Sequence, residues 1–132
     1  MPAQPLHFVV IDDNADTRFI VVRSLAKTFP AATIKECSDA QRALDAASAP
    51  SVSAAVIHRT TEMTGLYFIQ LLRKANPTVP ILMVSGVDRT PAALAAGANA
   101  FVLFDQGQRI GLAVAELVSP KPATASAVAS TG

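Results

Sequence analysis

The strongest constraint on the fold is a regular alternation along the chain of two kinds of apolar pattern. Short apolar runs rich in β-branched residues, typical of buried strands, are each followed by a segment whose apolar residues fall three or four apart, as in an amphipathic helix. Strands joined by helical crossovers run parallel, and right-handed crossovers place helices on both faces of the sheet. The sequence therefore predicts a doubly wound α/β domain with a parallel sheet of five strands, at residues 7–11, 33–37, 52–57, 81–85 and 100–104.

Capping and breaking residues mark the ends of the predicted helices. Ser38 and Gln41 are expected to form a capping box at the start of the second helix, and Thr64 is expected to cap the third. In the fourth helix, Pro91 suits the first helical position and Gly97 suits the residue after its end. The first helix is expected to face the core through an apolar stripe made of Phe19, Val22, Leu25, Ala26 and Phe29.

Composition limits the number of domains and the class of partner. The chain has 132 residues, of which 51% are hydrophobic, and this is the length of one ordinary domain. We assign residues 1–118 to that domain and predict that residues 119–132, rich in Ala, Ser, Thr and Pro, are disordered. A net charge of +1 without a basic block gives no support for nucleic-acid binding. No apolar stretch is long enough to cross a membrane and the first residues do not resemble a signal peptide, so a cytoplasmic protein is expected.

Two adjacent carboxylates stand where a parallel sheet binds its ligands. Ligands of open parallel sheets bind beyond the carboxyl ends of the strands, and Asp12 and Asp13 come directly after the first predicted strand. Carboxylates about 4 Å apart repel by about 4 kcal/mol at an effective dielectric constant of about 20, so one takes a proton or a cation such as magnesium lies between them. In the alternative, Asp13 or Asn14 caps the first helix while Asp12 is solvated.

Four motifs within this pattern resemble a known family. They are VVIDDN at residues 9–14, MTGL at 63–66, PILMVSG at 80–86 and AGANAF at 96–101. Over residues 6–118, the chain resembles the CheY-like receiver domain of response regulators, which are signalling proteins of two-component systems. The resemblance implies a flavodoxin-like fold with the strand order 2-1-3-4-5.

The resemblance also implies roles for individual residues. In receivers, the acidic pair helps to hold magnesium, an aspartate that ends the third strand accepts the phosphoryl group, and a serine or threonine that ends the fourth strand binds that group. A lysine at the end of the fifth strand pairs with it. By this resemblance Asp12 and Asp13 are metal ligands, Ser85 is the switch hydroxyl and Phe101 is the switch aromatic residue.

Two residues of the receiver set are replaced in this chain. Counting back from Gly65 with the family's usual spacing places Ile57 at the phosphoacceptor position, whereas a loop shorter by one residue places His58 there. We favour His58, because the apolar run 54–57 then ends in a polar residue at the edge of the sheet. Phe104 stands where the family has lysine. Aspartyl phosphorylation is therefore not expected, and the chain resembles a degenerate receiver, or pseudo-receiver.

His58 has several alternative roles beside the acidic pair. A protonated imidazole would supply the positive charge that magnesium supplies in receivers, through charge-assisted hydrogen bonds. The alternatives are a transition-metal site made with Asp12 and Asp13, phosphorylation of His58 itself, and a hydrogen-bonded histidine without any ligand. No cofactor is expected to be required, and any binding of magnesium is expected to be weak.

These features predict a stand-alone receiver-like domain that works in two-component or related signalling by protein–protein contact and is not an enzyme. The expected partner is a histidine kinase or another signalling regulator. A homodimer is also expected to be feasible through the face of the fourth helix, fifth strand and fifth helix, which is predicted to be poor in charge and rich in small residues. The runner-up is an α/β domain that binds a metal or a small ligand in the crevice of Asp12, Asp13 and His58.

Overall fold

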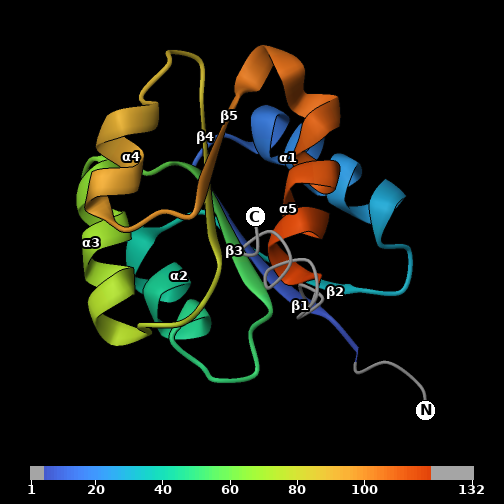
Figure 1. The fold of residues 1–132 in the computed structure, drawn as a ribbon, viewed down its shortest axis with the longest axis horizontal. Coiled ribbons are helices and arrows are strands. Elements are labelled where there is room, and N and C mark those ends of the chain that lie inside the picture. The colour runs from blue at the N-terminus through green and yellow to red at the C-terminus, as the bar shows by residue number, and fades with distance from the viewer. Residues whose placement is uncertain (1–4, 120–132) are drawn as a thin grey trace, which may run out of the picture.

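The computed structural model describes residues 5–119, and five βα units account for nearly all of them (Figure 1). The strands lie parallel in the order β2-β1-β3-β4-β5, which confirms the predicted flavodoxin-like class. The strands are β1 (His7–Asp12), β2 (Thr33–Cys37), β3 (Ala54–Arg59), β4 (Ile81–Ser85) and β5 (Ala100–Leu103). The helices are α1 (Ala15–Thr28), α2 (Ala40–Ala47), α3 (Gly65–Ala75), α4 (Thr90–Ala96), the 3₁₀ helix η1 (Phe104–Arg109) and α5 (Ile110–Val118). The predicted tail, 119–132, lies outside the described residues except for Ser119.

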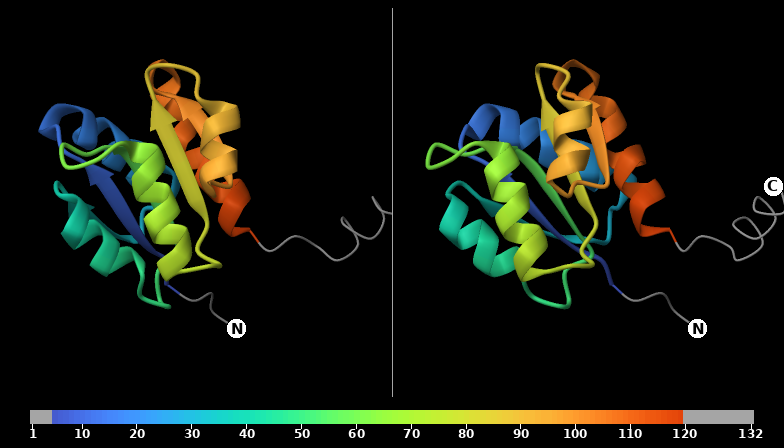
Figure 2. Two further views of the ribbon diagram at one scale, coloured as in Figure 1. Left: turned by 90° about the vertical axis from the view of Figure 1, so that its left-hand side faces the viewer. Right: turned by 60° about the vertical axis from the view of Figure 1, so that its left-hand side comes forward.

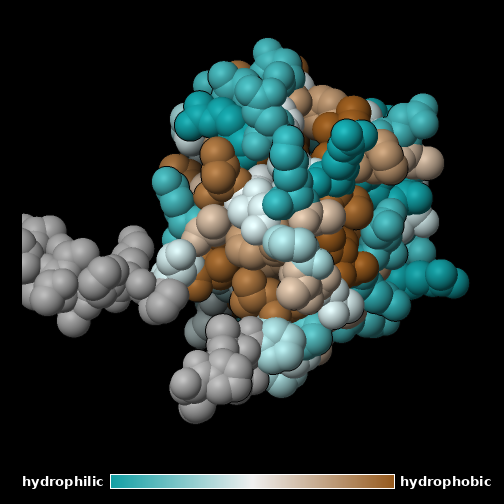
Figure 3. Space-filling view, turned by 90° about the vertical axis from the view of Figure 1, so that its right-hand side faces the viewer, coloured by the Kyte–Doolittle hydropathy of each residue, from teal (hydrophilic) through white to brown (hydrophobic). Residues whose placement is uncertain are grey.

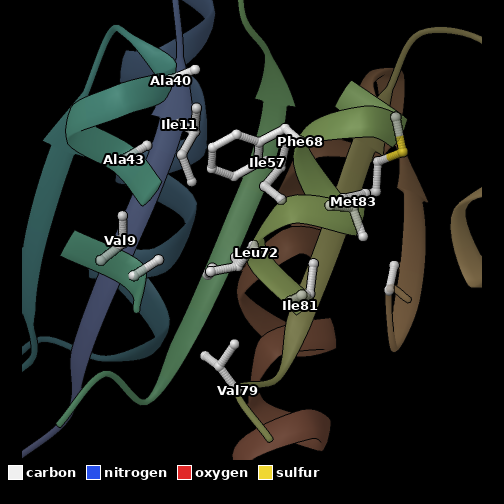
Figure 4. Packing of buried hydrophobic residues seen from close by; sticks show 14 of the residues in the cluster. Val9, Ile11, Ala40, Ala43, Ile57, Phe68, Leu72, Val79, Ile81 and Met83 are labelled. Atoms are coloured by element: carbon white, nitrogen blue, oxygen red, sulfur yellow. The ribbon is translucent and has the colours of Figure 1, made fainter. Parts of the chain in front are cut away.

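Helices cover both faces of the sheet, and each face has its own hydrophobic core (Figure 2). Along β1 the side chains alternate: Val9 and Ile11 pack with α2 and α3 (Figure 4), whereas Phe8 and Val10 pack with α1 and α5. All four are at most 3% exposed, and burying a side chain of this kind contributes about 1.5–3 kcal/mol. Because β1 is buried on both faces, its carboxyl end is fixed firmly between β2 and β3.

Several predicted helix ends are confirmed. The Thr64 hydroxyl accepts a hydrogen bond from the Tyr67 N–H and caps α3, and Gly97 ends α4 with a φ of 122°. A positive φ of this size is strained for any residue with a side chain, which explains glycine at this position. Pro91 lies in the first turn of α4 but is its second residue, since the helix begins at Thr90.

The predicted cap of α2 is wrong by one residue. Asp39, not Ser38, caps this helix, because its carboxylate accepts from the Arg42 N–H. A second N–H of the first turn, that of Ala40, donates to the carboxylate of Glu62. Carboxylates suit the positive end of a helix dipole, and Glu62 comes from the distant β3–α3 loop. The predicted capping box does not form because the helix begins one residue later, at Ala40, and the adjacent Asp39 is its N-cap.

The apolar stripe predicted for α1 is partly wrong. Val21 and Leu25 are fully buried, whereas Phe19 is 61% exposed. Two adjacent stripes of α1 satisfy helical periodicity, and packing against the sheet and α5 selects the one through Val21 and Leu25. Phe19, Ile20 and Leu112 instead line a groove of about 480 Å³ between α1 and α5, on a side of the molecule where hydrophobic patches reach the surface (Figure 3).

The ends of two strands differ from the prediction in ways that shape the site. Strand β3 continues to Arg59, two residues beyond the predicted end, and β5 stops at Leu103, so that Phe104 begins η1. Across the described part of the chain, the helices are too short or too polar to cross a membrane.

Candidate functional site

A β-bulge sets the geometry at the carboxyl ends of β1 and β3. Ile11 is paired with Ile57, but Asp12 is paired with Arg59, so two residues of β3 stand against one residue of β1. An extra residue of this kind bends the strand and re-aims its side chains. As a result, the neighbouring residues His58 and Arg59 each contact one of the two acidic residues at the end of β1, Asp12 and Asp13.

Asp12 is fully buried, and hydrogen-bond donors of the protein surround its carboxylate. Oδ2 lies 2.8 Å from Nδ1 of His58 and accepts from the Thr17 hydroxyl at 2.7 Å, while Oδ1 accepts from the Asn14 N–H at 3.0 Å. Burial raises the pKa of Asp12, but the hydrogen bonds from His58, Thr17 and Asn14 together outweigh it, and the pKa lies below its ordinary value. The carboxylate is therefore ionised at neutral pH and can only accept, so the hydrogen of the contact belongs to Nδ1 of His58.

Asp13 has a separate cationic partner. Its Oδ1 accepts from Nε of Arg59 at 2.9 Å, and its backbone N–H donates to the Arg59 carbonyl at 3.2 Å. The Arg59 side chain is 57% exposed, so this ion pair lies at the surface, unlike the contact between His58 and Asp12. Each acid of the pair therefore has its own hydrogen-bond partner on β3.

The carboxylate oxygens at this edge are not arranged as ligands of a magnesium ion. Both oxygens of Asp12 already accept from protein groups, and Asp13 accepts from Arg59. Over residues 5–119, there is no group of three His, Cys, Asp or Glu side chains that could hold a metal. The three-ligand site of His58, Asp12 and Asp13, one of the alternatives considered from the sequence, is therefore not assembled, and Asp13 pairs with Arg59 instead.

Phe104 stacks on the imidazole of His58. The ring centroids are 4.8 Å apart and the planes differ by 13°. The two residues that were considered for the phosphoacceptor and lysine positions are thus in contact. Ile57, the other residue considered for the acceptor position, is fully buried in the core shown in Figure 4 and does not reach the edge.

Ser85, at the end of β4, lines the same cavity as His58 and Arg59, the partners of the acidic pair. Its Oγ accepts a single, long hydrogen bond of 3.3 Å from the Val87 N–H. The cavity has a volume of about 460 Å³ and opens between the loops that follow β3 and β4. It is lined by His58, Arg59, Thr60, Met63, Thr64, Gly65, Leu66, Met83, Ser85, Gly86 and Arg89.

Phe101, the predicted switch aromatic residue, lies on β5 opposite Met83 and is partly buried against the core under α3 and α4. It also lines a groove of about 430 Å³ formed by α4, β5, η1 and α5. Asp88, Arg109 and Glu116 line the same groove. The prediction that this face is poor in charge is therefore wrong at the groove, because these residues come from loops and helix turns that the topology brings together.

Two residues of the site have no role in the sequence prediction. Thr17 lies in the first turn of α1 and reaches back to Asp12, and Arg59 follows His58 on β3. The cationic side chain of Arg59, directly after His58, was a usable signal for a partner of the acidic pair. For Thr17 the sequence holds no comparable signal, because its contact depends on how α1 leaves β1.

Comparison with known proteins gives a consistent structural likeness. No family model and no curated protein matches the chain. The signal receiver domain of the response regulator NarL from Mycobacterium tuberculosis is 26% identical, with a TM-score of 0.77 over 90% of this chain and 100% of that one. The chemotaxis response regulator CheY4 of Vibrio cholerae is 20% identical, with a TM-score of 0.72 over 88% of this chain and 100% of that one. The response regulator domain of Thermotoga maritima CheB is 18% identical, with a TM-score of 0.74 over 90% of this chain and 100% of that one. Identities as low as the last two show a shared fold alone.

Proposed function

The chain has the fold of CheY-like response-regulator receivers, and we propose that it acts in two-component signalling by protein contact, without aspartyl phosphorylation. The observation that carries this proposal is the pairing of His58 with Asp12 and of Arg59 with Asp13. These contacts occupy the acidic pair that receivers use for magnesium.

The chemistry of the edge supports this proposal. Phosphoryl transfer to a carboxylate needs a nucleophilic oxygen at the strand end and positive charge to balance the phosphoryl oxygens. At the end of β3 the residue beside Asp12 is an imidazole, and the residue stacked on it from the β5 side is the apolar ring of Phe104. His58 is not a carboxylate acceptor, and the ring of Phe104 carries no charge that could balance a phosphoryl group.

The same contacts favour one fixed arrangement of β1 and β3. In this arrangement charge-assisted hydrogen bonds hold the edge together without a ligand, and they are stronger than neutral hydrogen bonds. Signalling then depends on a partner that recognises this arrangement. The groove of α4, β5 and α5 offers an apolar side chain, Phe101, among charged residues, which suits a transient signalling partner such as a histidine kinase or a second copy of the chain.

The test is the intact mass of the protein after incubation with acetyl phosphate and magnesium. We expect no phosphoryl group on the natural chain, and one on the double variant His58→Asp, Phe104→Lys, which provides both an acceptor and a cation. The matched control is His7→Asp with Phe104→Lys, because His7 begins β1 at the opposite edge of the sheet. One phosphoryl group on an aspartate of the natural chain would overturn the proposal.

A second function, phosphotransfer through His58, has one specific observation in its favour. Because Nδ1 donates to Asp12, the lone pair of the imidazole lies on Nε2, which is the nucleophilic atom of a neutral histidine. Nε2 would form the bond to phosphorus as acetate leaves from acetyl phosphate. In the same experiment, an acid-labile phosphoryl group that is lost in His58→Ala would identify this function.

A further inference from the structure

The cavity beside His58 has no role in contact-based signalling, although its size and lining are those of a ligand site. Its volume of about 460 Å³ falls within the range of small-molecule pockets, roughly 300–1,000 Å³. It lies at the carboxyl edge of the parallel sheet, where open α/β folds bind ligands. We propose that this cavity binds, without covalent chemistry, a small organic anion that carries an oxyanion head on an apolar body.

The charges around the cavity favour an anion. Arg59 and Arg89 line it, and no aspartate or glutamate does. The carboxylates of Asp12 and Asp13 contact His58 and Arg59 but are not part of the lining, so both pairs place their cationic or donor members on the cavity side. Arg89 forms no ion pair within residues 5–119, and its guanidinium is therefore available for a bidentate contact with an oxyanion.

Two further polar groups on the lining are able to contact the head of a ligand: the Ser85 hydroxyl as a donor, and Nε2 of His58 as an acceptor from a head that keeps one proton. Ser85 Oγ accepts from the Val87 N–H, so its own hydrogen remains available to donate. Nε2 of His58 forms no hydrogen bond within residues 5–119, although the side chain is only 10% exposed. It is not a buried atom without a partner, so it faces accessible space, and the cavity is the space that His58 lines.

The remaining wall is apolar and determines the rest of the ligand. Met63, Leu66 and Met83 line the cavity, and methionine side chains adapt readily to an irregular apolar partner. Inorganic phosphate would leave the apolar side chains of this wall in contact with water. A neutral apolar molecule would leave Arg89 without a partner. A compound that combines both parts, with an aromatic or aliphatic body of a few carbon atoms, satisfies the whole lining. Contact-based signalling does not require such a ligand, so this site adds a function to the one proposed for the fold.

The probe that tests this site is phenylphosphonate, because its phosphorus–carbon bond prevents phosphoryl transfer and separates binding from phosphorylation. Titration of the isotope-labelled chain by NMR is expected to give saturable binding at one site, with the largest shifts at the amides of Gly65 and Gly86, which line the cavity. Benzyl alcohol and inorganic phosphate are expected to bind at least about tenfold more weakly, because each lacks one part of the ligand.

The matched variants are Arg89→Ala and Arg42→Ala. Arg42 lies on α2, outside the cavity, and its side chain is 83% exposed, so its removal changes the net charge equally. We expect Arg89→Ala to lower the affinity for phenylphosphonate about tenfold and Arg42→Ala to leave that affinity unchanged. Three results would overturn the proposal: no saturable binding, equal weakening in both variants, or shifts confined to the groove between α1 and α5.

Discussion

The two halves of the carboxyl edge of the sheet are held together very differently. On the β1–β3 side, Asp12 accepts three hydrogen bonds from protein donors and Asp13 pairs with Arg59. On the β4–β5 side, Ser85 accepts one bond of 3.3 Å, and Phe104 contributes a ring stack. Buried polar groups that are fully paired rigidify their surroundings, whereas sparsely bonded loops open more easily. Any response of this edge to a partner or ligand is therefore expected to arise on the β4–β5 side.

Removal of His58 is expected to have the largest effect on stability. His58→Ala takes one donor from the fully buried carboxylate of Asp12 and removes the ring that stacks on Phe104. Breaking a buried pair in this way costs about 3 kcal/mol in the free energy of unfolding, measured by urea denaturation. His7→Ala, at the opposite edge, is the control and should stay within about 0.5 kcal/mol of the natural chain. Equal losses of unfolding free energy in the two variants would show that the contacts of His58 do not stabilise the β1–β3 side more than the opposite edge is stabilised.

Lowering the pH is expected to weaken the contacts of Asp12 on the β1–β3 side. The pKa of Asp12 in the folded chain is below its ordinary value of 3.8, so its contribution to stability is present above that value and is lost as the pH falls through the lowered one. Urea midpoints should therefore fall as the pH is lowered from about 5 to about 3, and less steeply in Asp12→Asn.

Asp88 is the matched control for the acid experiment. Hydrogen bonds from the Thr90 side chain and N–H lower the pKa of Asp88 as well, but this carboxylate is exposed. Asp88→Asn should therefore change the slope of stability against pH less than Asp12→Asn does. The opposite order would place the acid-sensitive contact on the β4–β5 side.

Removal of Arg59 is expected to have a smaller effect than removal of His58. The Arg59 side chain is more than half exposed, and exposed ion pairs contribute less than about 1 kcal/mol. Urea denaturation of Arg59→Ala should show a loss in that range, and added salt should reduce the difference from the natural chain. A loss as large as that of His58→Ala would show that both acids of the pair depend equally on their partners.

The smallest effect is expected for Ser85. Its hydroxyl accepts one long bond from a loop N–H, so Ser85→Ala should change the free energy of unfolding by less than about 0.5 kcal/mol. Hydrogen exchange at Val87 is the more sensitive measurement and should become faster. A loss above about 1 kcal/mol would contradict the contrast between the two sides.

Much of the architecture could be predicted because it depends on local patterns. The apolar runs and helical periods predict five βα units, and Thr64 and Gly97 predict the ends of helices with their own side chain or backbone. The prediction failed for the cap of α2 and for the buried stripe of α1. At α2 the cap is Asp39, one residue beyond the predicted one, and the distant Glu62 adds a second acceptor; at α1, packing against the sheet and α5 selects the buried stripe.

The sequence by itself determined the fold class, the acidic pair at the end of the first strand and the absence of a carboxylate at either residue considered for the acceptor position. Only the tertiary structure decided that His58 rather than Ile57 reaches the edge, that Asp13 pairs with Arg59, and that Phe104 stacks on the imidazole. Asp12 and His58 are 46 residues apart, and their contact depends on one extra residue in the pairing of β1 with β3. A shift of one residue in a strand exchanges the side chains on its two faces, and the chain's local pattern does not specify where such a bulge falls.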